Sequence, residues 1–339
     1  MWKTAKIVAA NATVFVVLFL AAEMFLRFFM PAPPHGGYYL NENGEKERIS
    51  KDSLTLKKNR RFTHISSEFS ASITTNRFGY RKIKGGHDPG TLFIGDSFTF
   101  GHGIDDERTF SYLYCVDNRK SCMNLGYSGA DSFQALDILE AALAEHGFQP
   151  MHVILVFLGA CWIESSGNDL GGNILGAAKE ERKRRGKNSE TIEPTSENPP
   201  KKPARSILKT IQGTVSHLQI YQRIMLVVGG AIKRNLYSCS PPEDVEKAVL
   251  ATRKAFDRFL KIAAEEKFRP WVVLIHPSQE IGVMAYKKTE EILLRAARGK
   301  MRIIKTGARF NAKHYFPFDG HFNALGHANL AKILGGSLQ

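Results

Sequence analysis

The sequence lacks the short motifs that identify several common classes of enzyme. It contains no G-x-S-x-G, no H-E-x-x-H and no phosphate-binding loop. Their absence excludes the usual α/β-hydrolase elbow, the zinc-peptidase helix and the nucleotide-binding loop. Zinc-finger spacing, a basic region leading into heptads and an aromatic ribonucleoprotein motif are also missing, so we expect no nucleic-acid partner. We likewise expect no cofactor and no metal site.

Cysteine is scarce, with four in 339 residues. Cys115, Cys122, Cys161 and Cys239 form no C-x-x-C pair, which argues against a zinc ribbon or a dithiol redox motif. In an oxidising compartment, these four residues would allow one or two disulfides. Cys115 and Cys122 are the best local pair, and free buried thiols are the alternative.

Negative charge is in short supply: 33 Asp and Glu stand against 47 Lys and Arg, for a formal net charge of +14. Such an excess favours an anionic partner, which could be nucleic acid, an anionic polymer or a phospholipid surface. Without a nucleic-acid motif, we expect a basic surface beside phospholipid headgroups. Contents of 43% hydrophobic and 24% charged residues exclude collagen-like and wholly disordered chains.

One long apolar run is present, near the N-terminus. Residues 7–22 carry no charge, and the apolar stretch continues to Met30. As a helix it would exceed the roughly 30 Å of a bilayer core. Lys3 and Lys6 precede it, which places the N-terminus in the cytoplasm. We therefore expect residues 1–30 to be a single-pass anchor in the inner (cell) membrane, with the remainder facing the periplasm or the outside. A cleaved signal peptide is the alternative, although no small-x-small cleavage site follows.

The rest of the chain divides by composition. Residues 31–90 are polar and are interpreted as a linker and approach segment, with one strand over 68–75. In 91–339, short apolar runs alternate with amphipathic stretches, which predicts a parallel sheet covered by helices on both faces. The expected strands are 91–94, 153–158 and 271–275, and the expected helices are 110–114, 132–145, 243–266 and 324–334. A basic insertion at about 171–245 is expected to be partly disordered, and whether it caps the site is left open.

A serine follows the first of these apolar runs, in the sequence Gly95-Asp96-Ser97. A serine hydroxyl is a poor nucleophile near neutral pH and needs an adjacent base and donors for the developing oxyanion. Near the C-terminus, Asp319-Gly320-His321 offers an imidazole with a carboxylate two positions away. Such a carboxylate can hold the imidazole in the required tautomer. Together the two segments predict nucleophilic catalysis, provided that the fold brings them into contact.

These blocks resemble the SGNH, or GDSL-type, hydrolase superfamily, in the form of a bacterial membrane-anchored member. The resemblance implies a flavodoxin-like three-layer α/β/α sandwich with a central parallel sheet. It extends over roughly residues 74–335, apart from the insertion. The matching segments are 95–101 (GDSFTFG), 124–129 (NLGYSG), 319–327 (DGHFNALGH) and, in the approach segment, 76–81 (NRFGYR).

The resemblance also assigns roles: Ser97 is the nucleophile, His321 the general base and Asp319 the group that orients it. In this family the oxyanion is held by the serine N–H, a second-block glycine and a third-block asparagine, so the resemblance implies Ser97, Gly129 and an asparagine.

The third block departs from the family pattern. The expected strand at 153–158 continues into Gly159-Ala160-Cys161 with no asparagine, and Asn168 follows several residues later. We expect Asn168 to complete the oxyanion hole. If the asparagine is absent, the lost stabilisation is about 3 kcal/mol.

Four other polar residues have less specific interpretations. Asp96 is expected to be structural, and His327 to be a helix or surface residue. His102 and His276 follow expected strand ends and could line the site, but a structural role is the simpler interpretation for each.

Three functions agree with these observations. The first is an extracytoplasmic esterase that acts on acyl groups of lipids or carbohydrates. The second is an O-acetyltransferase or deacetylase of a surface polysaccharide or cell-wall glycan, since water and a sugar hydroxyl compete for one acyl-enzyme. The third is a catalytically weakened binding protein, suggested by the displaced third block. The sequence does not determine the acyl group, the acceptor or the oligomeric state.

Overall fold

A computed structural model describes residues 2–29, 37–49, 55–83, 88–159, 245–282 and 284–338. The chain forms two compact units. Helix α1 (Trp2–Phe29) belongs to one of them, and the described residues from Tyr38 onward belong to the other. Large apolar side chains on α1, such as Phe15 and Leu18, are exposed. In the described part of the chain, no helix combines the length and apolar character that a membrane crossing requires.

The centre of the larger unit is a five-stranded sheet in which every strand pair is parallel. The order across the sheet is β5-β4-β6-β7-β8, so β5 lies on one side of β4, and β6, β7 and β8 follow in turn on the other. This is the flavodoxin-like order, and the expected central parallel sheet is confirmed. In such sheets ligands bind beyond the carboxyl ends of the strands, where the order reverses. The strands are β4 (Thr91–Gly95), β5 (Cys122–Asn124), β6 (His152–Leu158), β7 (Arg269–Ile275) and β8 (Arg302–Lys305).

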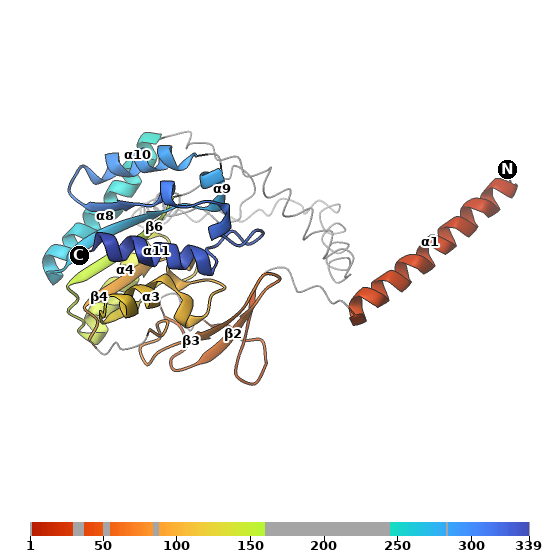
Figure 1. The fold of residues 1–339 in the computed structure, drawn as a ribbon, viewed down its shortest axis with the longest axis horizontal. Helices are drawn as coiled ribbons and strands as arrows, with labels where there is room; N and C mark the ends of the chain where they lie inside the picture. Colours follow the sequence, from red (N-terminus) through yellow and green to blue (C-terminus); the bar gives the residue numbers. More distant parts are fainter. Residues whose placement is uncertain are drawn as a thin grey trace, which may run out of the picture. The chain divides into compact units, whose positions relative to one another are not determined.

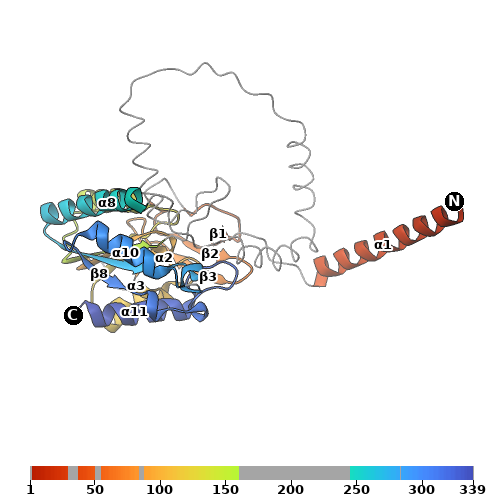
Figure 2. The same cartoon turned by 90° about the horizontal axis from the view of Figure 1, so that it is seen from above.

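Helices cover both faces of this sheet, as Figures 1 and 2 show. On one face α4 (Ser132–His146), α8 (Val245–Glu266) and α10 (Tyr286–Ala297) bury a core that includes Leu136, Phe256 and Leu293. On the other face α3 (Phe110–Asp117) and α11 (Ala324–Ser337) bury Phe110 and Leu330. Because β4 and β6 are buried on both faces, they are nearly continuous apolar runs. Short helices connect these elements: α2 (Ser97–Phe100), α9 (Ser278–Gly282), η1 (Asp106–Arg108), η2 (Gly307–Arg309) and η3 (Ala312–His314).

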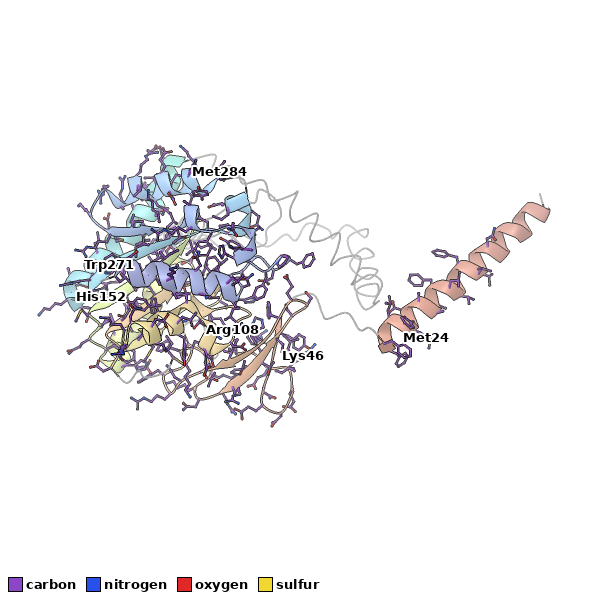
Figure 3. All side chains as sticks on the ribbon, viewed as in Figure 1. Met24, Lys46, Arg108, His152, Trp271 and Met284 are labelled. Atoms are coloured by element: carbon purple, nitrogen blue, oxygen red, sulfur yellow. A yellow bond between two sulfur atoms is a disulfide. The ribbon has the colours of Figure 1, made fainter. Side chains whose placement is uncertain are left out.

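The two ends of the parallel strands differ in character. At the amino ends, the Trp271 indole N–H donates to His152 Nδ1 at 3.2 Å, and both residues are labelled in Figure 3. The carboxyl ends lead into Ser97, Gly159 and His276. The polar groups that the sequence suggested for chemistry are therefore at the carboxyl edge.

A second, antiparallel sheet precedes the parallel one. It has the order β1-β2-β3, with β1 (Tyr38–Leu40), β2 (Arg61–Ile65) and β3 (Ser70–Thr74). The sequence indicated a single strand here, over 68–75. The other two were missed because β1 has three residues and because β2 buries the polar His64 beside Phe62, which breaks the apolar alternation of a strand. The sheet belongs to the same compact unit as the parallel sheet.

A disulfide joins Cys115 at the end of α3 to Cys122 at the start of β5. This was the favoured local pair, and both residues are buried. Cys161 and Cys239 lie outside the described residues. Because the bond closes a loop with a sequence separation of 7, chain entropy predicts a stabilisation of about 2 kcal/mol.

Reduction of this disulfide is expected to lower the melting temperature. The test uses a Cys161→Ser, Cys239→Ser variant, in which Cys115 and Cys122 are the only cysteines. Calorimetry with and without a phosphine reductant should give a drop of about 4–8 °C, since each kcal/mol shifts the melting temperature of a large domain by about 2–4 °C. An unchanged melting temperature after verified reduction would refute the stabilising role.

Candidate active site

Ser97 is the first residue of α2 and is separated from the end of strand β4 by Asp96 alone. β4 ends at Gly95, which has a φ of 147°. A Cβ at this position would collide with the Thr99 hydroxyl, so the tight turn requires glycine. The Asp96 carboxylate accepts a hydrogen bond from the Phe98 N–H at 2.9 Å and so caps the helix. This capping is the structural role expected for Asp96.

The fold brings the three residues predicted for the chemistry into one hydrogen-bonded chain. Ser97 Oγ and His321 Nε2 are 2.7 Å apart, although 224 positions separate them in the sequence. His321 Nδ1 and Asp319 Oδ1 are 2.5 Å apart. An ionised carboxylate only accepts hydrogen bonds, so Nδ1 carries the proton and Nε2 is free to accept from the serine. The arrangement can therefore take the proton of Ser97 during attack on a carbonyl.

The 316–323 loop, which carries Asp319 and His321, is fixed by its own backbone. The Phe316 N–H donates to the His321 carbonyl at 2.8 Å, and the Gly320 N–H donates to the Phe316 carbonyl at 3.0 Å. Gly320 takes a φ of 87°, a conformation that favours glycine. The Asn323 side chain then caps α11 by accepting from two N–H groups of its first turn. Asp-x-His spacing works here because the glycine turns the chain between the two functional residues.

Asp319 has partners on each side. Glu68, from the turn between β2 and β3, accepts hydrogen bonds from the backbone N–H groups of Phe318 and Asp319. His102 Nε2 faces the second carboxylate oxygen, Asp319 Oδ2, at 3.5 Å. Burial opposes ionisation of this carboxyl, but hydrogen bonds from His102 and His321 outweigh burial and hold the pKa of Asp319 well below its usual range. Asp319 is therefore ionised whenever His321 works as a base.

Of the rings behind this carboxylate, sequence reasoning named His102 as one that could line the site and missed His64 and Tyr39. His102 stacks on His321 with centroids 4.3 Å apart, and the edge of His64 meets His102 at 4.4 Å. Tyr39 stacks on the far side of His64 at 4.2 Å. Burial, followed by the neighbouring His102, lowers the pKa of His64 to about 3, so His64 is neutral. No local pattern in β1 or β2 pointed to these side chains, because they reach the site only through the packing of the small sheet.

The structure describes two of the three predicted oxyanion donors, Ser97 and Gly129. The N–H of Ser97 is at the first turn of α2, where N–H groups have no partner within the helix. Gly129 follows β5 with a φ of 85° and open space around its Cα. Asn168 lies outside the described residues, so its part in an oxyanion hole stays a prediction.

The two other histidines singled out in the sequence are buried. His327 lies in α11, as expected, but inside the core, where its Nδ1 accepts from the Phe110 N–H at 3.1 Å. His276, beyond β7, holds Glu280 through Nδ1 at 2.6 Å. Neither residue contacts Ser97 by any interaction found among the described residues, so both are structural.

One group of side chains in the described residues has the geometry to hold a metal ion. Ligand atoms of His102, Asp319 and His321 all lie within 4.8 Å of one another. These residues already contact one another, through His321 Nδ1 and Asp319 Oδ1 and through His102 Nε2 and Asp319 Oδ2. A metal at this position would compete with the Nδ1–carboxylate hydrogen bond on which base catalysis by His321 depends.

Asp96, next to Ser97, gives a prediction of pH-dependent stability. Burial raises its pKa to about 7, against an ordinary value of about 3.9. The folded state therefore binds the extra proton between about pH 4 and pH 7, and wild-type stability falls as the pH rises through that window. Three units correspond to about 4 kcal/mol.

In the Asp96→Asn variant this loss should vanish, because asparagine caps helices comparably without a charge. Its unfolding free energy relative to wild type should rise by about 2–4 kcal/mol between pH 4 and pH 8, measured by urea denaturation. Asp131→Asn, at the cap of α4, controls for exchange of a capping residue. A difference between Asp96→Asn and wild type that stays constant with pH would contradict the prediction.

Comparison with solved structures finds esterases and a GDSL-like lipase. The psychrotrophic esterase EstA from Pseudoalteromonas sp. has 13% identity and a TM-score of 0.39, covering 74% of this chain and 97% of that chain. A GDSL-like lipase from Bacteroides thetaiotaomicron has 11% identity and a TM-score of 0.37, covering 73% and 86%. A family 3 carbohydrate esterase from Clostridium thermocellum has 13% identity and a TM-score of 0.36, covering 73% and 92%.

No protein-family model matches the chain, and no curated protein sequence matches it. At such low identities and TM-scores, the structural likenesses carry no conclusion about the activity of this chain. The function must be argued from the geometry of its own site.

Proposed function

We propose that this protein is a serine acyl hydrolase, an esterase that works through an acyl-enzyme on Ser97. The observation that carries the proposal is the continuous chain from Ser97 Oγ to His321 Nε2 at 2.7 Å and from His321 Nδ1 to Asp319 Oδ1 at 2.5 Å. A serine aligned with an imidazole that a carboxylate orients is the arrangement that nucleophilic catalysis requires.

The reaction follows from these contacts. His321 Nε2 takes the Ser97 proton as Oγ attacks the ester carbonyl, and the imidazolium then gives that proton to the departing alcohol. Water attacks the resulting acyl-serine, with His321 again accepting a proton, and the carboxylic acid leaves as the serine is restored. Asp319 remains ionised throughout and stabilises the imidazolium.

The developing oxyanion needs donors at the same edge of the sheet. We assign this role to the N–H groups of Ser97 and Gly129 and to the side chain of Asn168. The first is supported by the position of Ser97 at the start of α2. Each well-placed donor contributes about 3–4 kcal/mol to transition-state stabilisation.

The acyl-enzyme can be resolved by water or by a sugar hydroxyl, since either nucleophile would use His321 as its base. The proposed substrates are therefore acylated lipids or carbohydrates, and acyl transfer to a glycan is the alternative outcome. The binding-protein alternative is less favoured, because a protein without chemistry has no need for an aligned serine, imidazole and carboxylate.

We propose in addition that the N-terminal helix attaches the protein to the cell membrane, with the hydrolase domain outside the cytoplasm. The support is the uncharged run at residues 7–22, the exposed apolar side chains of α1 and the Cys115–Cys122 disulfide, which suits an oxidising compartment. A reporter enzyme active only outside the cytoplasm, fused after Gln339, should be active in cells. If a different reporter, one that works only in the cytoplasm, were active at the same fusion point, this orientation would be refuted.

Covalent trapping tests the proposed chemistry without knowledge of the natural substrate. A fluorophosphonate probe should label the full-length protein at Ser97, identified by peptide mass mapping, because the probe reacts only with an activated serine. Ser97→Ala should abolish labelling, whereas Ser70→Ala, on an exposed position of β3, should not change it. A folded wild-type protein that resists the probe would overturn the proposal.

A further inference from the structure

We propose that His102 is a positioning residue that holds the second oxygen of Asp319 and so fixes the carboxylate against His321. The inference rests on the proposed function and names a residue beyond the three that carry the chemistry. Asp319 Oδ1 is occupied by the imidazole and the backbone N–H of His321. Oδ2 faces His102 Nε2 at 3.5 Å. The carboxylate thus lies between two imidazoles, one on each oxygen.

The backbone around His102 is unusually well fixed. Its N–H donates to the carbonyl of Ser97 at 3.0 Å, which ties it to the helical turn that carries the nucleophile. Gly101 and Gly103, on either side, have φ angles of 86° and 73°. A Cβ at Gly103 would meet the ring of Phe69 at 2.7 Å. The chain therefore has little freedom to move His102 away from the carboxylate.

The ring of His102 is held as firmly as its backbone. It stacks on His321 at an interplanar angle of 25°, and His64 and Phe69 meet it edge-on from the small sheet. A ring packed on three sides loses little further freedom when its Nε2–H points at Oδ2, so the hydrogen bond is formed at low entropic cost. Hydrogen bonds of this kind often tighten when substrate is bound.

Groups of both signs surround the ring of His102. The titratable and charged groups facing its surroundings are His64 on β2, Asp319 and His321 on the 316–323 loop, and Arg81, which donates to the adjacent Gly101 carbonyl. An N–H at Nε2 of His102 orients the Asp319 carboxylate and spreads its negative charge, which weakens the hold of the carboxylate on the His321 proton.

Two substitutions distinguish the contribution of the His102 N–H from that of its ring. His102→Phe keeps the stack on His321 but has no N–H, whereas His102→Gln keeps an amide N–H near the position of Nε2 but has no ring. With a p-nitrophenyl ester, His102→Phe should lower kcat about 10-fold with little change in KM, the equivalent of one hydrogen bond to a charged group. His102→Gln should remain within about 3-fold of wild type.

The pH profile distinguishes positioning from simple loss of structure. Without the donor, Asp319 binds the His321 proton more strongly, so the rising limb of kcat should move to higher pH in His102→Phe by about 0.5 unit. In His102→Gln the rising limb of kcat should stay at the pH of the wild type. His152→Phe, the same replacement at the opposite edge of the sheet, should leave the limb unchanged.

A measurement that needs no turnover keeps this test independent of the proposed function. In the Ser97→Ala background, the titration of His321 followed by NMR should move to higher pH when His102→Phe is added, and not when His102→Gln is added. If that shift is present while the wild type hydrolyses no ester, the esterase proposal fails and the positioning role stands. If the titration is unmoved, or if both His102 variants behave alike in kcat and pH profile, the positioning role is overturned.

Discussion

Replacement of Ser97 by alanine is expected to lower kcat for short-chain p-nitrophenyl esters by about 10⁴-fold or more, since removal of the nucleophile leaves only binding and oxyanion stabilisation. The expectation follows from the 2.7 Å contact between Ser97 Oγ and His321 Nε2, which no other side chain can reproduce. The measurement is a steady-state assay on the full-length protein in detergent, with folding checked by circular dichroism. In the wild type, the rate should rise with pH as His321 becomes neutral.

Substitutions of His321 and Asp319 should also lower kcat, and their effects should not add to the effect of Ser97→Ala. His321→Ala and Asp319→Asn are each expected to lower kcat by about 10³–10⁴-fold, the second because an amide stabilises the wrong tautomer of the imidazole. The Ser97→Ala, His321→Ala double variant should be no slower than Ser97→Ala alone, because the two residues act in one step.

The control for these three variants is Ser70→Ala, which alters an exposed serine at the start of β3. Activity that survives in Ser97→Ala would reject this serine as the nucleophile. Additive losses in the double variant would show that His321 acts independently of Ser97, which would contradict the proposed mechanism.

The second large effect concerns stability and arises at Arg81. This guanidinium is 1% exposed, and it donates to the carbonyls of Phe100, Gly101 and Ile104 while its Nε pairs with Asp106 at 3.0 Å. Arg81→Met should lower the unfolding free energy by about 3–5 kcal/mol, because it leaves the half-buried Asp106 carboxylate without its cation and three backbone carbonyls without their donor. Urea denaturation monitored by fluorescence would measure the loss.

Two further variants separate this network from a general effect of arginine loss. Arg77→Met removes an exposed guanidinium that lies over the ring of Phe78, and it should cost less than about 0.5 kcal/mol. Arg81→Met with Asp106→Asn should recover part of the loss, because the unpaired charge is removed. Equal losses in Arg81→Met and Arg77→Met would contradict the prediction.

Long elements of the parallel domain were predictable because their patterns are strong. The expected strands at 91–94, 153–158 and 271–275 correspond to β4, β6 and β7, and the expected helices at 132–145 and 324–334 correspond to α4 and α11. The edge strands β5 and β8 and the helix α10 were missed. An edge strand of three or four residues such as Cys122–Asn124 or Arg302–Lys305 is too short to show a periodic signal.

The residues of the site also fall into those that the sequence predicted and those that it did not. Ser97, Asp319 and His321 are recognisable because each occurs in a short block with its own chemical logic, and the contact among them was the stated condition of the prediction. His64, Glu68 and Tyr39 carry no such local mark. They approach Asp319 and His102 only because the small sheet packs against the loop between α2 and α3 and against the 316–323 loop.

The amino-acid sequence by itself determined which residues have reactive chemistry and which segments are buried strands or amphipathic helices, because nucleophile, base and hydrophobic period are local properties of the chain. Only the tertiary structure decided the surroundings of the catalytic carboxylate, with His102 on one oxygen and Glu68 on the neighbouring backbone. Those contacts join segments far apart in the chain, and their energies arise from burial and packing that no short stretch of sequence encodes.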